Sequence, residues 1–331
     1  MRATDYRTSI NSVLFFLSRL ILQIANLAPN HRANDVIIVE GGKPIINARF
    51  CYGPMDLVDL AREDISTYLH LVGCDWNLLS TNRTDMNGRI SVSVPDRIPC
   101  GIHCAKMIVH GDRTFVDVFI AVLPYGTRCV VFSIDGSLTS SVSVTGKDPR
   151  LQPGVVDVVR FWHDLGYPII YVTARPDMQQ KAVTAWLGLH NFPHGLLFFT
   201  PSFSTDPLRQ KLLHLKALVE MGITIHAAYG SNKDVPVYSS IGIAAERIFT
   251  VRRGKLKGCV HLDGYSAHLS DLSGGAIPFA EPVESSLLFQ RHNPIANESL
   301  VRRTHSFASR SGRYRLSDLK EKKQSISTQS R

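Results

Sequence analysis

Cysteine is scarce in this sequence, and the few cysteines are widely spaced. Six occur in 331 residues, and none forms a CxxC pair. Cys100 and Cys104 flank His103, but no second pair of ligands follows at the spacing of a zinc site. A disulfide scaffold and a zinc cluster are therefore excluded, and we expect reduced thiols in the cytosol.

The chain also lacks a long apolar run and a calcium loop. Residues 13–27 are largely apolar, but Arg19, Gln23 and Asn26 are spaced to share one helical face. A membrane span needs about 20 mostly apolar residues, and a signal peptide needs an unbroken apolar core. We expect residues 1–30 to be an amphipathic segment, either a core helix or a loose surface anchor. No EF-hand loop is present, so no calcium is assigned.

Acidic residues are rare at the C-terminal end. Residues 301–331 hold nine Lys or Arg against Asp318 and Glu321, which places about +7 of the net charge of +9 there. Because residues 273–331 lack periodic hydrophobicity and are rich in Ser, Arg and Lys, we expect a basic disordered tail. It could lie on an anionic leaflet or stay solvated. Nucleic acid is not expected, since no recognition fold accompanies the charge.

Residues 31–125 have the period of two that is typical of β-strands. Apolar and polar side chains alternate over residues 65–71 and again over 90–94. Asn-Gly at residues 87–88 and Gly-Asp at residues 111–112 predict hairpin turns, because these residues tolerate positive φ. Short strands at this spacing predict an immunoglobulin-like β-sandwich.

From residue 126 to residue 272 the pattern changes to a β/α repeat. Apolar strands are predicted at residues 129–134, 168–173, 196–200, 223–229 and 247–251. Helices are predicted between them at residues 154–165, 177–187, 207–221 and 235–241. Fully apolar strands between helices predict a parallel sheet that is covered on both faces, with ligands at the carboxyl ends of its strands.

Polar side chains follow several of these strands, at the edge where a ligand would be held. The residues are Ser133, Asp135, Gly136 and Ser137, then Thr173, Ala174 and Arg175, then Lys211, and finally Gly230, Ser231, Asn232 and Asp234. Each alone has an ordinary structural explanation, since an Asp-Gly pair is a common turn and surface cations are usually only solvated. Their joint order along the chain favours a phosphate site.

This order resembles that of the haloacid dehalogenase superfamily. There a first-strand Asp-x-Asp attacks phosphorus and moves a proton, a Ser or Thr and a lysine bind phosphate oxygens, and a late aspartate holds magnesium. The resemblance implies an α/β, Rossmann-like parallel sheet. Such chemistry needs a nucleophile in line, cations around the phosphoryl charge, and an acid for the leaving oxygen.

A closer resemblance is to the lipin-type domain of membrane-associated phosphatidylinositol transfer proteins, the retinal degeneration B and Nir group. It is carried by "SIDGSLT", "YVTARPDMQ", "HNFPHGLLFF", "DPLRQK" and "YGSNKDVPVYSSIGI", and upstream by "NHRANDVI" and "YGPMDLV". In lipins an immunoglobulin-like sandwich also packs on the catalytic fold. The family's N-terminal lipid-transfer domain has no counterpart here, so the chain looks like a C-terminal piece, a short isoform or an incomplete gene model.

The resemblance places Ser133 where lipins have the attacking aspartate. A neutral hydroxyl without an evident general base is a much poorer nucleophile than an ionised carboxylate, so we expect hydrolysis to be lost. The exchange also removes one negative charge from a pocket for phosphate. We therefore expect a degenerate, non-enzymatic site that holds a phosphate monoester.

The resemblance also implies which residues hold the ligand. The phosphate or lipid is assigned to Ser133, Asp135, Gly136, Ser137, Thr173, Ala174, Arg175, Lys211 and Asn232, with Lys216 as the competitor of Lys211. Asp135 and Asp234 could share a weakly bound Mg²⁺, but no cofactor is expected to be required.

Together these features predict a module that senses phosphatidic acid. The expected partners are an anionic phospholipid and a membrane surface, within phosphatidylinositol transfer and signalling, and the protein partners are unknown. The family implies a cytoplasmic, peripheral location at contact sites of the endoplasmic reticulum or plasma membrane. Two alternatives stay open, namely a weakly active Mg-dependent phosphatidate phosphatase and a protein-interaction scaffold.

Overall fold

The computed structural model describes residues 27–53, 56–94, 98–140, 149–202, 204–251 and 257–280. The predicted amphipathic segment 1–30 and the predicted basic tail 273–331 therefore lie almost wholly outside the described residues. Among the described helices, none combines the length and the apolar character needed to cross a bilayer.

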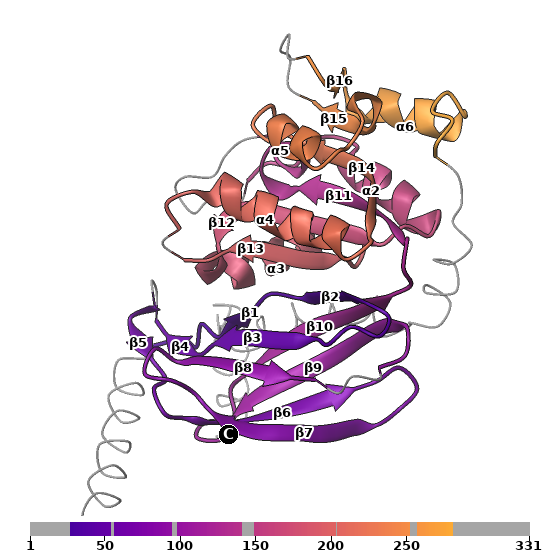
Figure 1. Ribbon diagram of the computed structural model, residues 1–331. Coiled ribbons are helices and arrows are strands. Elements are labelled where there is room, and N and C mark those ends of the chain that lie inside the picture. Colours follow the sequence, from indigo (N-terminus) through magenta and orange to yellow (C-terminus); the bar gives the residue numbers. More distant parts are fainter. Residues whose placement is uncertain are drawn as a thin grey trace, which may run out of the picture.

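Residues 32–123 form a β-sandwich of two sheets (Figure 1). The three-stranded sheet has the order β1 (Arg32–Ala33), β3 (Ile45–Arg49), β8 (Arg89–Ser93). The five-stranded sheet has the order β2 (Val36–Val39), β10 (Phe115–Leu123), β9 (Gly101–Val109), β6 (Asp64–His70), β7 (Trp76–Arg83). A short ribbon pairs β4 (Cys51–Tyr52) with β5 (Val58–Asp59). The prediction of a β-sandwich is confirmed.

The two predicted hairpin turns have different outcomes. Residues 111–112 join β9 to β10, which pair antiparallel, so this hairpin is confirmed. Residues 87–88 join β7 to β8, which belong to different sheets, so the second hairpin is wrong. Gly88 has φ +67°, and a Cβ there would lie 2.2 Å from the carbonyl oxygen of Phe50. The Asn-Gly pair therefore permits a tight turn without deciding which sheet the next strand joins.

The second half of the chain is a parallel sheet, as predicted, but it has six strands where five were predicted, because β16 (Val260–His261) was missed. Its order is β13 (Leu196–Thr200), β12 (Ile169–Pro176), β11 (Arg128–Ser133), β14 (Thr224–Gly230), β15 (Ile248–Thr250), β16 (Val260–His261). Its helices are α2 (Val155–Asp164), α3 (Gln180–Leu189), α4 (Pro207–Glu220), α5 (Val235–Ser240) and α6 (Tyr265–Ser273). The short 3-10 helices are η3 (Asp177–Gln179) and η4 (Ala245–Arg247).

Both faces of this sheet are buried, which explains the apolar strands. In β11, Val130 and Phe132 pack with α2, α3 and α6, whereas Cys129 and Val131 pack on the other face with α4 and α5. The core on the α4 side also contains Phe119 and its neighbours from β2, β9 and β10. The two domains therefore share one hydrophobic core, and burial of this apolar surface holds them together.

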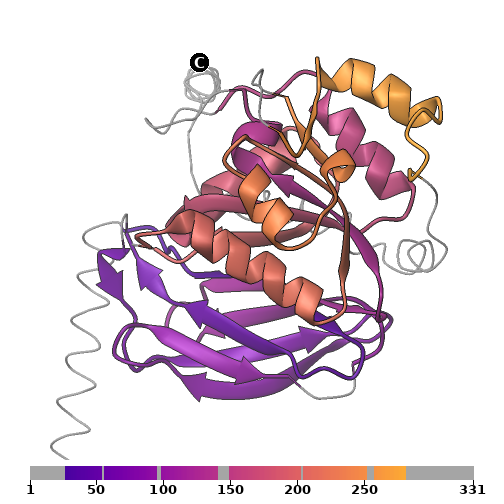
Figure 2. The ribbon, with the colours of Figure 1, turned by 45° about the horizontal axis from the view of Figure 1, so that its top comes forward.

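The seam between the domains also has polar contacts along β13, the edge strand of the parallel sheet. The side chain of Asn34 accepts a hydrogen bond from Phe199 N at 2.9 Å and donates to Phe199 O at 3.3 Å. The carboxylate of Asp35 accepts from Leu197 N and from Phe119 N, each at 2.9 Å. Side chains of the sandwich thus cover an edge that would otherwise leave backbone groups unpaired. Figure 1 and Figure 2 both place the sandwich beside β13.

We expect Asp35→Ala to lower the free energy of unfolding by about 2–4 kcal/mol, because two buried backbone N–H groups lose their acceptor. Urea denaturation monitored by circular dichroism measures this change. Asp85→Ala is the matched control, since Asp85 also accepts from two N–H groups, but in an exposed turn where water replaces it. Equal losses for the two variants would contradict the role given to Asp35.

Candidate functional site

The loop after β11 is shaped by a tight contact with the loop after β14. It forms a single π-helical turn, η2 (Ile134–Leu138), that is interrupted by non-helical backbone at Asp135 and Gly136. Gly136 has φ +107°, and a Cβ there would lie 2.6 Å from the Cβ of Ser231. Only glycine fits this position without moving one of the loops.

Ser133 ends β11 in a fully buried position and contacts two polar groups. Its hydroxyl donates to the carbonyl oxygen of Asp135 at 3.3 Å and accepts from Lys211 Nζ at 3.0 Å. Lys211 comes from α4, and its ammonium group also binds Asp234 Oδ1 at 2.5 Å. Both members of this ion pair are at most 3% exposed. The structure therefore brings Ser133, Lys211 and Asp234 together, although they are 78 and 23 residues apart in the chain.

Asp234 is held in turn by Ser231, a residue that the sequence analysis placed at this edge of the sheet without giving it a role. Its second oxygen, Oδ2, accepts from the backbone N–H and from the hydroxyl of Ser231, both at 2.8 Å. Gly230 permits this arrangement, because a Cβ there would lie 2.7 Å from the Cβ of Asp234. The Ser-x-x-Asp spacing is a local signal that could have indicated this contact.

A second group forms around the carboxylate of Asp135. Its Oδ2 accepts from the hydroxyl of Thr173 at 2.7 Å, and its Oδ1 accepts from Arg175 Nε at 2.8 Å. The guanidinium NH2 of Arg175 lies 2.7 Å from the same oxygen. Thr173 also accepts from the backbone N–H of Arg175 at 3.0 Å, which fixes the end of β12. The Ser133–Asp135 contact joins this group to the first.

The other predicted residues lie around these two groups. Ser137 is buried, donates to the carbonyl of Ser133, and has its own carbonyl bound by Tyr265 of α6 at 3.0 Å. Burial raises the pKa of Tyr265, so its hydroxyl remains a donor. The carbonyl of Ala174 accepts from Thr200 at 3.1 Å. Asn232 is not joined to either group, and its buried Oδ1 has no hydrogen-bond partner among the residues that the structure describes.

Between the two candidate lysines of α4, the structure places Lys211 at the site. Lys216 is 59% exposed and pairs with Glu220 at 3.6 Å, one helical turn further along the same helix. The side chain of Lys211 is 3% exposed and points to Ser133. The structure thus gives Lys216 a surface ion pair and separates it from the site.

The charges of the site are balanced in pairs. Lys211 faces Asp234, and Arg175 faces Asp135. Within the described part of the chain, no three His, Cys, Asp or Glu side chains gather as a metal site would require. Mg²⁺ prefers several oxygen ligands, and both carboxylates here already bind a cationic side chain. The residues that are present therefore do not fit a resident divalent cation.

Taken together, the fold and the site define a β-sandwich fused to a parallel α/β domain with a polar cluster at its strand ends. Comparison with known proteins gives this architecture a family. A family model described as "PITM 1-3, beta-sandwich domain" matches residues 29–122, and one described as "PITM 1-3, LNS2 domain" matches residues 130–252.

Curated relatives agree with both matches. "Protein retinal degeneration B" of Drosophila melanogaster is 49% identical over 271 residues, which cover 78% of this chain and 22% of that protein. Human "Membrane-associated phosphatidylinositol transfer protein 3" is 48% identical over 263 residues, covering 77% of this chain and 27% of its own length. Human "Membrane-associated phosphatidylinositol transfer protein 2" is 46% identical, covering 77% and 20%.

The chain belongs to the family of membrane-associated phosphatidylinositol transfer proteins, as the resemblance predicted. It matches 20% to 27% of the length of these relatives and holds their β-sandwich and LNS2 domains. Among solved structures, a HAD-like phosphatase from Mesorhizobium loti covers 55% of this chain and 95% of its own, at 14% identity and a TM-score of 0.37. That similarity is too low to assign the fold, so the haloacid dehalogenase-like and immunoglobulin-like assignments stay predictions.

Proposed function

We propose that the α/β domain is a haloacid dehalogenase-like fold that binds the phosphate monoester headgroup of phosphatidic acid without hydrolysing it. One observation carries the proposal. The buried hydroxyl of Ser133 ends β11 and is held at 3.0 Å by the ammonium group of Lys211. A phosphate oxygen beside Ser133 would meet neutral and cationic donors at the position where an attacking carboxylate would repel it.

The contacts of Ser133 argue against catalysis. A serine hydroxyl needs a base to take its proton before it can attack phosphorus. Lys211 is ion-paired with Asp234, so its ammonium group donates hydrogen bonds and has no lone pair for a proton. The other contact of the hydroxyl is a backbone carbonyl. This is the ground on which we propose a non-enzyme, a pseudophosphatase.

The proposal gives the two ion pairs a role in binding. A phosphate dianion needs more positive charge than this site offers while carboxylates neutralise both of its cations. Arg175 is the cation that can turn to the ligand, because its side chain is 17% exposed while that of Lys211 is 3% exposed. Magnesium is not required in this scheme, because Arg175 supplies the charge when it turns from Asp135 to the ligand.

The membrane part of the proposal follows from the relatives, which are named as membrane-associated. We propose a peripheral location on a cytoplasmic membrane face, at contact sites of the endoplasmic reticulum or plasma membrane. A role in phosphatidylinositol transfer and signalling is also only proposed. This chain spans at most 27% of the length of those relatives, so the activity of the whole proteins does not carry over to it directly.

Co-sedimentation with vesicles tests the proposal. We expect the protein to pellet with phosphatidylcholine vesicles that contain phosphatidic acid, and to stay in solution with phosphatidylcholine alone. Phosphatidylserine at equal surface charge is the control, because a site for a monoester should distinguish it from general electrostatic attraction. Phosphate release is followed in the same samples, with and without Mg²⁺.

Each alternative gives its own result. Phosphate release from phosphatidic acid by the wild-type protein, lost in Ser133→Ala, would identify a weakly active phosphatase. Equal retention on phosphatidic acid and phosphatidylserine vesicles would contradict a specific headgroup site. No retention on either would favour the protein-interaction scaffold.

A further inference from the structure

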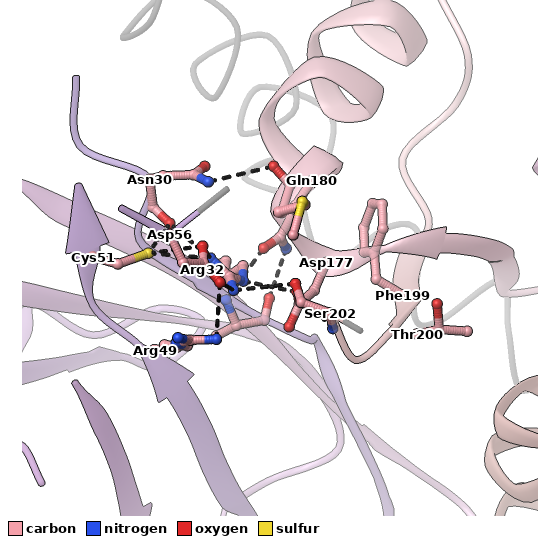
Figure 3. Close-up of polar contacts among 12 residues, drawn as sticks. Asn30, Arg32, Arg49, Cys51, Asp56, Asp177, Gln180, Phe199, Thr200 and Ser202 are labelled. Carbon is pink, nitrogen blue, oxygen red and sulfur yellow. Dashed lines mark hydrogen bonds and ion pairs between the residues drawn. The ribbon is translucent and has the colours of Figure 1, made fainter. Parts of the chain in front are cut away.

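Arg32 of the sandwich reaches across the seam into the α/β domain, as Figure 3 shows. Its guanidinium group binds Asp56 of its own domain through two contacts, NH1 to Oδ1 at 2.6 Å and NH2 to Oδ2 at 2.5 Å. Its Nε lies 2.9 Å from Asp177 Oδ1, and its NH2 donates to the hydroxyl of Ser202 at 3.2 Å. One side chain thus joins the sandwich to two loops of the α/β domain.

This contact is buried. The side chains of Arg32 and Asp56 are each 2% exposed. Burial works against ionisation of Asp56, but its hydrogen bond and ion pair with Arg32 outweigh burial and hold its pKa below the usual value. Arg49 adds a second cation, 2.8 Å from Asp56. A buried fork that is fixed on one side by a carboxylate presents its remaining donors in a defined direction.

The two loops that Arg32 contacts lead directly to the candidate site. Asp177 follows β12 and stands two residues after Arg175, the partner of Asp135. Asp177 also accepts from the backbone N–H of Ser202 at 3.1 Å, which joins the ends of β12 and β13. Thr200 adds a further link, because its hydroxyl donates to the carbonyl of Arg175 at 2.9 Å. The chain of contacts from Arg32 to Arg175 is continuous.

We infer that Arg32 is a positioning residue for the phosphate site, so that the binding module is the two domains together. The ion pair with Asp177 fixes the end of β12, and this sets the direction from which Arg175 meets the ligand. This inference rests on the proposed function. It adds that a residue outside the α/β domain controls the affinity of the site.

Asp177→Asn is the main test, because it removes the charge at the seam while leaving the buried Arg32–Asp56 pair intact. We expect the dissociation constant for vesicles containing phosphatidic acid to rise about tenfold. Arg32→Lys should act in the same direction, since an ammonium group cannot span Asp56 and Asp177 as the fork does. Arg83→Met is the control, because Arg83 forms an exposed ion pair with Asp64 within the sandwich, does not contact Asp56, and should leave the affinity unchanged.

A double-mutant cycle with Arg175→Ala separates positioning from a general loss of stability. If Asp177 acts through Arg175, Asp177→Asn should change the affinity less than about twofold in the Arg175→Ala background. Additive effects, or an equal loss of affinity in Arg83→Met, would overturn the inference. If the wild-type protein does not bind these vesicles, the proposed function fails, and amide hydrogen exchange still tests the contact. Residues 173–177 should exchange faster in Asp177→Asn than in Arg83→Met, and equal exchange would overturn the positioning role.

Discussion

Lys211→Met is expected to lower the free energy of unfolding by about 3–5 kcal/mol and to abolish retention on vesicles that contain phosphatidic acid. The loss of stability has a simple cause, because Asp234 would remain buried without its cation. The loss of binding has a second cause, since Ser133 would lose the donor that holds its hydroxyl. Urea denaturation and co-sedimentation measure the two effects separately.

Lys216→Met is the matched control on the same helix. Its exposed pair with Glu220 predicts a loss of about 0.5 kcal/mol or less and full retention on vesicles. The double variant K211M/D234N separates the two effects of Lys211, because it removes both buried charges while the amide oxygen can still accept from Ser231, so stability should largely recover and binding should stay abolished. Retention of vesicles by this double variant would contradict the role of Lys211 in the site.

The parallel sheet could be predicted because the burial of each strand is visible in that strand's own sequence. Each strand between two layers of helices must be apolar on both faces, and β11 shows this directly in the sequence. The strand β7 could not be predicted in this way. Most of its residues are exposed, so it has no apolar alternation, and it forms because its backbone pairs with β6.

The sequence predicted which polar residues gather at the strand ends, but it did not predict which of them contact one another. The order of residues indicated that Ser133, Lys211 and Asp234 lie at one edge, because parallel strands bring their carboxyl ends together. It did not indicate that Lys211 would pair with Asp234, nor that Tyr265 of α6 would bind the loop through Ser137. These contacts depend on side-chain directions that become fixed when the helices pack.

The polar contacts between the two domains were the largest feature that the sequence did not predict. The motif "NHRANDVI" was noted for its resemblance, while its physical role was not predicted. Asn34 bonds to a residue 165 positions away, and Asp35 to one 162 positions away. No spacing rule connects such residues, because their pairing follows from how two complete domains pack.

The charge balance of the site connects the seam with the proposed function. Two cations face two carboxylates, so the cluster is neutral before a ligand arrives. Exchange of one neutral residue for an acidic one therefore changes the net charge of the whole cluster. Ser133 is the position where that exchange has the clearest consequence, because it contacts both groups.

Ser133→Asp should give the site a stronger Mg²⁺ response than we expect of the wild-type protein. A third carboxylate beside Asp135 and Asp234 makes the oxygen-rich, net negative cluster that Mg²⁺ prefers. At a hundred times its dissociation constant, Mg²⁺ would stabilise the variant by about 2.7 kcal/mol, which thermal unfolding with and without the ion measures. Without Mg²⁺, the added charge should weaken retention on phosphatidic acid vesicles about tenfold or more.

The same variant tests the proposal that the site does not hydrolyse phosphate because it lacks this carboxylate. An ionised carboxylate attacks phosphorus without first losing a proton, so phosphate release from phosphatidic acid should begin in Ser133→Asp and stay absent in the wild type. Ser133→Asn is the control, because it has nearly the same shape as the aspartate and no charge. If Ser133→Asn responds to Mg²⁺ as strongly as Ser133→Asp, the charge at this position does not govern the site. If the wild type releases phosphate as fast as Ser133→Asp, the hydroxyl itself is a competent nucleophile and the protein is a phosphatase.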